Sequence, residues 1–155
     1  MLVRKAKLQD VHKNLANIFI DAFNLHLECR PDIFGSSKSN EDLKNELINI
    51  IENNNNIIVC EDDGVVVGYI MYKIDVKKNK TLWIDQLAVD ETKRGKGIAK
   101  SLINKVRNLA YEENCDRVEL CCWAFNDNAM EMYKHLGFNT QRVIFEENVN
   151  KKNKN

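Results

Sequence analysis

The amino-acid sequence predicts one mixed α/β domain built on a mixed sheet. Apolar residues recur every three or four positions in some segments and alternate or run together in others, which predicts helices and strands in one chain. No Pro- or Ser-rich linker and no internal repeat divides the 155 residues, a length that suits a single core. The predicted order is β-α-α-β-β-β-α-β-α-β(-β), with one domain over residues 1–148 and a frayed polar tail over 149–155.

The first third is predicted to be a short strand and two helices. The strand covers residues 2–6, and helical spacing of apolar residues begins at Gln9 and continues to Leu25. The segment 30–35 contains Pro31 and Gly35 and breaks this helix. A second helix follows, with acidic residues in its first turn and an Asn-rich end at 53–56.

The rest of the chain is predicted to alternate strands and helices. Three strands form a meander, with a hairpin turn at Asp62-Asp63-Gly64. A well-patterned helix, a strand, a short helix capped by Gly137 and a last strand then follow. In chain order, these elements are expected at residues 57–60, 65–74, 81–89, 98–109, 118–123, 126–136 and 142–146.

Composition excludes several classes of protein. Lys plus Arg and Asp plus Glu both number 23, and this zero net charge argues against a general nucleic-acid binder. No run approaches the roughly 20 apolar residues that span a bilayer, and the N-terminus is charged before a signal-like stretch develops, so we expect a cytoplasmic protein. The five cysteines contain no C-x-x-C pair, so we expect no metal site and reduced, mostly buried thiols.

A basic, glycine-containing segment lies between a predicted strand and a predicted helix. The first-turn N–H groups of a helix lack helical partners and attract phosphate, and glycines let a bulky anion approach the backbone. Arg94, Lys96 and Lys100 add positive charge at the same place, so the sequence predicts a pyrophosphate site. A P-loop does not fit because Ala99 precedes Lys100-Ser101, and a dinucleotide fingerprint does not fit because Lys100 stands at its third glycine.

Three patterns in the sequence resemble those of one known family. The pattern Arg94-x-x-Gly97-x-Ala99 resembles the acetyl-CoA signature of the GNAT superfamily of N-acetyltransferases. The pattern Asn126-x-x-Ala129-x-x-x-Tyr133-x-x-x-Gly137-Phe138 is similar to its second half, and Val67-Gly68-Tyr69 is similar to its hairpin element. The resemblance extends from about residue 57 to 145. It implies the acyl-CoA N-acyltransferase fold, in which the central strands splay apart, and acetyl-CoA as co-substrate.

The resemblance also implies a set of site residues. The pantetheine arm would pair with the strand that ends at Val89, the pyrophosphate would lie on the loop, Asn126 would hydrogen-bond pantetheine, and Tyr133 would protonate the leaving thiolate. The implied cofactor-binding residues are Leu87, Ala88, Val89, Arg94, Gly95, Lys96, Gly97, Ile98, Ala99, Lys100, Asn126 and Tyr133.

The expected chemistry is direct aminolysis of the thioester, which needs a base for the amine and an acid for the sulfur. Asp85 is predicted to be the base, directly or through water, because it shares strand parity with Trp83, Leu87 and Val89. The alternative is a strand charge paired with a nearby Lys. Glu61, Glu119 and His135 are weaker candidates, more typical of surface groups.

Other residues keep two interpretations. Tyr133 can be a core residue, and Asn126 can be a helix N-cap. His26, Arg30 and Asp32 either contact the acceptor substrate or form a helix-end loop held by Pro31.

The function expected from these residues is transfer of an acetyl group to a primary amine of a small molecule or peptide. The alternatives are a non-catalytic acyl-CoA sensor and an acetyltransferase of protein N-termini or lysines. We expect a homodimer and neither nucleic acid nor membrane as partner, and the sequence does not identify the acceptor.

Overall fold

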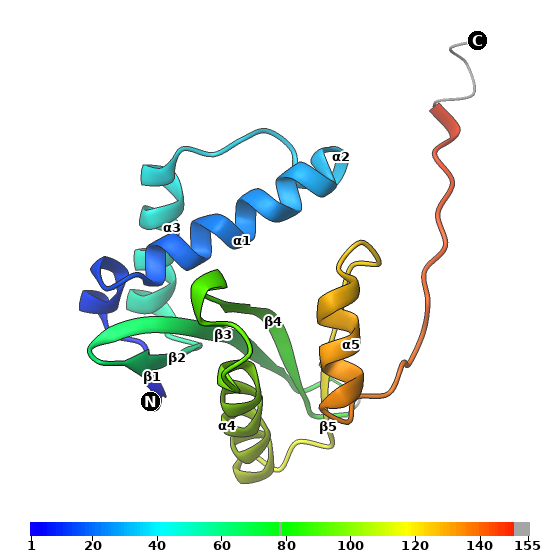
Figure 1. Ribbon diagram of the computed structural model, residues 1–155. Helices are drawn as coiled ribbons and strands as arrows, with labels where there is room; N and C mark the ends of the chain where they lie inside the picture. Colours follow the sequence, from blue (N-terminus) through cyan, green and yellow to red (C-terminus); the bar gives the residue numbers. More distant parts are fainter. Residues whose placement is uncertain (78, 151–155) are drawn as a thin grey trace. The chain divides into compact units, whose positions relative to one another are not determined.

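The computed structural model describes residues 1–77 and 79–150. The chain divides into two compact units, Met1–Cys121 and a second that begins at Cys122 (Figure 1). From residue 151 onward the predicted tail lies outside the described residues. That residues 1–148 form a single domain stays a prediction.

The first unit is built on a five-stranded mixed sheet, which confirms the predicted class. Neighbouring strands run antiparallel except for the last two, which are parallel. The meander at residues 57–89 is confirmed. In spatial order, the strands are β1 (Leu2–Lys5), β2 (Ile57–Asp62), β3 (Val65–Asp75), β4 (Thr81–Val89) and β5 (Arg117–Leu120).

The β2–β3 turn forms where the sequence predicted it. Asp63 and Gly64 both have positive φ, at 48° and 77°. Two such residues make a turn whose twist matches that of paired antiparallel strands, and Asp and Gly tolerate this backbone. The hairpin register therefore follows from local sequence alone.

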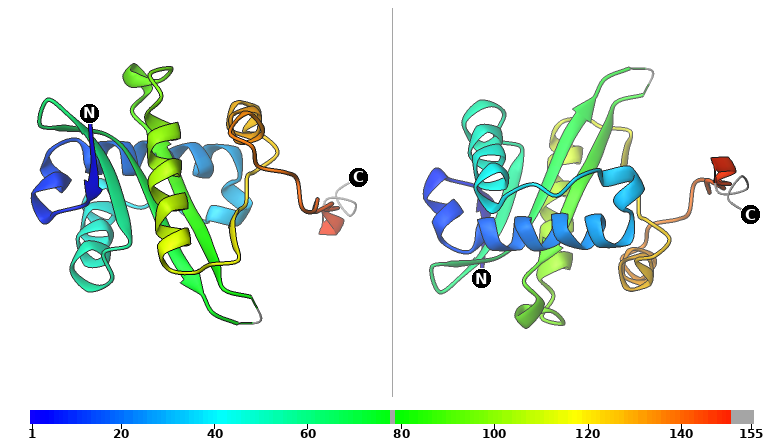
Figure 2. Two further views of the ribbon diagram at one scale, coloured as in Figure 1. Left: turned by 90° about the horizontal axis from the view of Figure 1, so that it is seen from below. Right: turned by 90° about the horizontal axis from the view of Figure 1, so that it is seen from above.

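Helices cover both faces of the sheet. α1 (Leu15–Cys29) and α3 (Asn40–Asn53) cover one face, and α4 (Ile98–Glu112) covers the other (Figure 2). Alternate strand residues face opposite sides, so Val59 and Tyr69 pack with α1 and α3 while their neighbours face α4. The largest fully buried side chains include Tyr69, Leu15, Leu43, Leu47, Leu82, Leu102 and Ile103.

The single helix predicted from Gln9 is divided in two. A 3-10 helix, η1 (Leu8–His12), precedes α1, and between them Asn14 has a left-handed φ of 79°. Asn adopts this conformation more readily than other residues with a side chain, so the helical pattern continues while the backbone does not. The predicted break at Pro31 contains one further turn of helix, α2 (Pro31–Phe34).

The last strand predicted at residues 142–146 is absent from the described structure. The second unit contains the predicted short helix, α5 (Asp127–His135), and no strand among its described residues. Val143, Ile144 and Phe145 are 66%, 79% and 92% exposed. An apolar run becomes a strand only when another strand pairs with its N–H and C=O groups, and the run itself does not supply that strand. For the same reason, β5 ends at Leu120, before the predicted residue 123.

The expectation that the cysteines are mostly buried is wrong. All five are free thiols, and only Cys60 is buried. Cys29 is exposed because it is the last residue of α1, and Cys121 is exposed because it follows the end of β5. Cys115 and Cys122 are partly buried.

A buried carboxylate fixes β1 to the rest of the first unit. Asp10 has no exposed surface, and Arg4 donates to both of its oxygens, at 2.7 and 2.9 Å. Arg4 also donates to Glu61 on β2. Burial opposes ionisation of Asp10, but the hydrogen bonds from Arg4 and the Lys7 amide outweigh it and hold the pKa below its ordinary value. The network therefore stabilises the fold while Asp10 is charged.

The Asp10→Asn substitution should lower the free energy of unfolding by about 2 to 3 kcal/mol at neutral pH, because Arg4 loses its buried charged partner and keeps only Glu61. The folded-state pKa is depressed, so this contribution is present above the ordinary carboxylate range and is lost as pH falls below about 4. Urea unfolding at pH 7 and pH 3 should show a smaller difference between wild type and variant at pH 3. Asp21→Asn, at an exposed position of α1, is the matched control; an equal loss in both variants would contradict the prediction.

Candidate functional site

A β-bulge interrupts β4 at Asp85. Gln86 pairs with Met71 and Ile84 pairs with Tyr72, so Asp85 is an extra residue with no partner on β3. The expected parity is therefore wrong. Trp83 pairs with Lys73 and Leu87 pairs with Ile70, which places Trp83 and Leu87 on opposite faces. One inserted residue reverses the alternation for everything after it.

Asp85 forms an ion pair with a neighbouring strand. Lys73 Nζ lies 3.4 Å from Asp85 Oδ1, and the two side chains are 59% and 37% exposed. This ion pair is the alternative interpretation of Asp85 that the sequence left open beside the role of general base. An exposed pair of this kind contributes less than about 1 kcal/mol, so the carboxylate stays reachable by an incoming amine. The weaker candidates Glu61 and Glu119 pair with Arg4 and Arg117.

The outer edge of β4 is open beyond the bulge. β5 pairs with β4 only from Thr81 to Ile84, and β4 continues to Val89. Within the described residues, no strand pairs with this edge at Leu87, Ala88 and Val89. β5 ends at Leu120, where this open stretch of the β4 edge begins, and the edge beyond has backbone groups available to an extended ligand.

The loop after β4 presents its backbone to solvent. Gly95 and Gly97 have φ of 78° and 76°, and nothing lies within 4 Å of a Cβ added at either position. The left-handed backbone, and not crowding, is therefore what requires glycine there. Gly97 is the N-cap of α4, whose first turn has no side-chain cap and no acidic residue. Arg94 and Lys96 are exposed beside these amides.

Close packing positions the start of α4. A Cβ at Gly68 on β3 would lie 2.9 Å from Ile98 Cγ2 and 3.1 Å from the Ala88 carbonyl oxygen. A real Cβ essentially never makes a contact as short as the one with Ile98, and the one with Ala88 is unusually tight, so glycine lets α4 approach β3 and β4 at this point. Among sequence signals, only the family resemblance singled out this glycine.

A hydrogen-bond network missed by sequence reasoning holds the other end of the loop. Asn14 Nδ2 donates to Asp90 Oδ2 at 2.7 Å and to the Val66 carbonyl at 3.1 Å. Asp90 also accepts from the Thr92 amide and hydroxyl, and these bonds hold its pKa below the ordinary value. Asp90 donates its own amide to Val67. The loop thus begins from a fixed point between the first helices and the sheet.

The second unit contains Asn126 and Tyr133. Asn126 is the N-cap of α5, and its Oδ1 accepts from the Ala129 amide at 3.2 Å, as the alternative interpretation expected. The Tyr133 ring packs edge-on against Phe138, with centroids 5.8 Å apart. Burial raises the pKa of the Tyr133 hydroxyl, so it stays protonated at neutral pH. A hydroxyl in this state can donate a proton.

His26, Arg30 and Asp32 gather at the α1–α2 junction of the first unit. Arg30 donates through Nε and Nη2 to Asp32, both at 2.9 Å. His26 Nδ1 lies 2.7 Å from the Ala22 carbonyl, and its ring packs on Phe34. These contacts fit the helix-end interpretation, in which the three side chains stabilise the turn at Pro31. The acceptor role stays a prediction.

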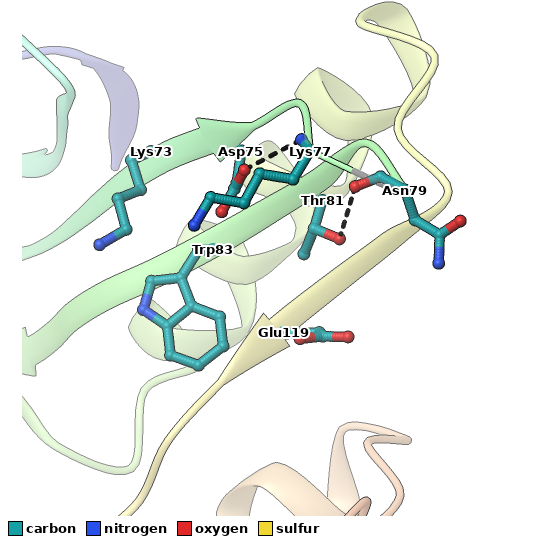
Figure 3. A pocket seen from close by; sticks show the side chains of 7 residues that line it. All are labelled: Lys73, Asp75, Lys77, Asn79, Thr81, Trp83 and Glu119. Carbon is teal, nitrogen blue, oxygen red and sulfur yellow. Dashed lines mark hydrogen bonds between the residues drawn. The ribbon is translucent and has the colours of Figure 1, made fainter.

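A cleft lies over Trp83 on the sheet face that carries Lys73 (Figure 3). Its volume is about 310 Å³. Lys73, Trp83 and Glu119 occupy one line of register across β3, β4 and β5. Figure 3 shows Lys73 on one side of the indole and Glu119 on the other. The remaining lining residues are Asp75, Lys77, Asn79 and Thr81. In the sequence, the only sign of this cleft was a tryptophan, Trp83, on a predicted strand with charged residues on the neighbouring strands.

The described residues contain neither a candidate metal-binding group nor a helix that could span a membrane. Between residues 1–77 and 79–150, His, Cys, Asp and Glu side chains form no group of three that could hold a metal ion. In the same ranges, no helix has the length and apolar composition that would let it cross a membrane.

Comparison with known proteins supports one family. The acetyltransferase (GNAT) family model matches residues 19–138. Spermine/spermidine N(1)-acetyltransferase of Bacillus subtilis is 30% identical over 82 residues, 49% of this chain and 54% of that protein. N-alpha-acetyltransferase 30 of Saccharomyces cerevisiae is 33% identical over 84 residues, 53% of this chain and 48% of that protein. The chain spans about half or less of the length of the curated relatives that it matches.

The fold also matches solved structures. The crystal structure of a mutant protein from Bacillus halodurans superposes with a TM-score of 0.80, over 96% of this chain and 99% of that chain. At 24% sequence identity this similarity shows the fold alone. The mixed sheet and its covering helices are therefore those of an established architecture.

The Asn14→Gly substitution should lower the free energy of unfolding by about 1 to 2 kcal/mol, because Asp90 and the Val66 carbonyl lose a donor while the left-handed backbone is kept. Amide exchange should become faster from Asp90 to Gly97. Asn14→Ala loses the same bonds and adds backbone strain of about 1 kcal/mol, which separates the two effects. If amide exchange at residues 90–97 is unchanged in the Asn14→Gly protein, Asn14 does not hold the loop in place.

Proposed function

This chain belongs to the acetyltransferase (GNAT) family, and from that membership we propose that it transfers the acetyl group of acetyl-CoA to a primary amine. The observation that supports this most strongly is the combination of two features in one unit. The start of α4 has no side-chain cap and lies in a basic loop, and the strand before this loop, β4, has an open outer edge. One suits a pyrophosphate, and the other suits the amide groups of a pantetheine arm.

We propose that the loop binds the pyrophosphate through backbone amides. The first-turn amides of α4, with those of Gly95 and Gly97, point toward an anion at the helix start. Arg94, Lys96 and Lys100 would add charge attraction from exposed positions. The network at Asp90 and the contact at Gly68 fix the loop before the ligand arrives, so little ordering entropy is lost on binding.

The pantetheine arm is proposed to pair with β4 beyond the bulge. Leu87, Ala88 and Val89 offer unpaired backbone groups on the outer edge, and an added strand would satisfy them. In this proposal Asn126 supplies a further hydrogen bond from its amide nitrogen, since only its Oδ1 is used in capping α5.

The proposed reaction forms one C–N bond and breaks one C–S bond. Asp85 takes a proton from the amine, directly or through water, and the nitrogen attacks the thioester carbonyl. A backbone N–H of the β4 edge near Leu87 would stabilise the developing oxyanion. Tyr133 gives its proton to the leaving thiolate.

Membership of the family does not identify the class of amine that accepts the acetyl group. One relative is named for spermine and spermidine and another for an N-alpha position, so a small amine and a protein N-terminus both remain candidates. A non-catalytic acyl-CoA sensor is the second function, and release of coenzyme A with a panel of amines distinguishes it from the enzyme. The homodimer, the cytoplasmic location and the absence of nucleic-acid and membrane partners stay predictions.

Acetyl-CoA should raise the melting temperature by several degrees. A ligand at 100 times its Kd adds about 2.7 kcal/mol to the stability of the folded state. Gly97→Glu should abolish the shift, because a carboxylate would repel the pyrophosphate at the helix start. Gly97→Asn is the control, since Asn tolerates the φ of 76° and should keep most of the shift. No shift with millimolar acetyl-CoA in the wild type would overturn the proposed function.

Tyr133→Phe should lower kcat by about a hundredfold, the lower part of the range for a lost general acid, since a thiolate needs less proton assistance than an alkoxide. The Kd for acetyl-CoA should change much less, because the ring and its contact with Phe138 remain. Single-turnover and equilibrium binding measurements separate the two. Full activity of the Phe variant would show that Tyr133 is a packing residue.

A further inference from the structure

The cleft over Trp83 begins beside the proposed catalytic base. Lys73 lines the cleft, and its ammonium reaches Asp85 on β4 at 3.4 Å. From there the lining residues continue away from the bulge along β3 and β4, toward the turn that joins them (Figure 3). A molecule whose reacting amine lies at Asp85 can therefore extend into this cleft.

Two of the charges in the cleft already have partners. Lys73 pairs with Asp85, and Glu119 on β5 lies 3.6 Å from Arg117. Asp75 and Lys77 differ from these. In the described part of the chain, neither the Lys77 ammonium nor the Asp75 carboxylate forms an ion pair, and Asp75 Oδ1 accepts only the backbone amide of Lys77, at 3.1 Å. The cleft thus presents one cation and one anion, two residues apart, to an incoming molecule.

We propose that this cleft holds the far end of the acceptor and that this end is a zwitterionic α-amino-carboxylate. This inference rests on the proposed acetyltransferase function and adds the substrate class. Lys77 would bind the carboxylate, Asp75 would bind the α-ammonium, and the indole of Trp83 would cover the connecting methylene groups.

The dimensions suit a chain of several methylene groups. Successive residues on a strand are about 3.3 Å apart, so Asp85 and Trp83 are separated by roughly 6 Å along β4. Thr81, which pairs with Asp75 across the strands, lies about as far again beyond Trp83. The side-chain amine of an amino acid such as lysine can reach Asp85 when its α-carbon is held between Trp83 and Thr81.

The same charges disfavour a polycation. Lys73 and Lys77 both line the cleft, and a diamine that replaced the carboxylate with hydrogen would leave Lys77 without a counter-charge. Specificity of this kind depends on repulsion of the wrong ligand as much as on attraction of the right one.

Three acceptors with the same amine and chain length test the inference: lysine, cadaverine, which lacks the carboxylate, and 6-aminohexanoate, which lacks the α-ammonium. Release of coenzyme A is measured with each. Lysine should have the highest kcat/KM. Lys77→Gln should lower kcat/KM for lysine and 6-aminohexanoate about threefold to tenfold and should not lower it for cadaverine, which has no carboxylate for Lys77 to bind. Asp75→Asn, which keeps the oxygen that accepts the Lys77 amide, should affect lysine and cadaverine and spare 6-aminohexanoate.

Lys105→Gln, an equal charge change at an exposed position of α4, should leave kcat/KM unchanged for all three acceptors. Equal loss with all three acceptors in the Lys77 variant would overturn the inference, as would a wild type that prefers cadaverine or acetylates other amines but not lysine. These results leave the proposed function intact when acetyl-CoA still raises the melting temperature. Absence of that shift, with no turnover of any amine, overturns both.

Discussion

Strand β4 is longer than the strand that pairs with its outer edge, and the architecture of the site depends on this inequality. β4 has nine residues and β5 has four, so more than half of the β4 edge has no partner strand in the described structure. Unpaired backbone groups inside a protein are unfavourable unless water or a ligand reaches them. The sheet is therefore incomplete in a way that an extended ligand can complete.

The bulge at Asp85 makes the two halves of β4 differ. Before it, Leu82 and Ile84 face α4, and Trp83 faces the side of α1. After it, Leu87 takes the face of Ile84, while Gln86 accepts a hydrogen bond from the buried Tyr69 hydroxyl at 2.9 Å. The inserted residue thus exposes one carboxylate on the α1 side without disturbing the packing of α4. In a regular strand Gln86 would face α4 and Leu87 would face the side of α1, so the bulge exchanges the faces of these two residues.

Much of the fold could be predicted because its signals are local. The meander and α4 follow from apolar patterns, and the Asp63-Gly64 turn from its residue types. The loop at residues 94–99 could be singled out as a candidate anion site because its glycines and cations are adjacent in the sequence. The bulge was missed because Ile84-Asp85-Gln86 contains no glycine or proline to mark it. The strand at 142–146 was wrong for a different reason: pairing depends on a distant partner, which no short window contains.

The contact between Asn14 and Asp90 joins residues 76 positions apart. Closing so long a loop costs conformational entropy that only the packing of the intervening elements offsets, so such a contact forms late in folding. The Asn14–Asp90 anchor of the loop before α4 therefore cannot form on the growing chain until the first helices and the meander have packed together. Affinity for the nucleotide end of a ligand would then be acquired last, as a property of the finished core and not of the motif that encodes it.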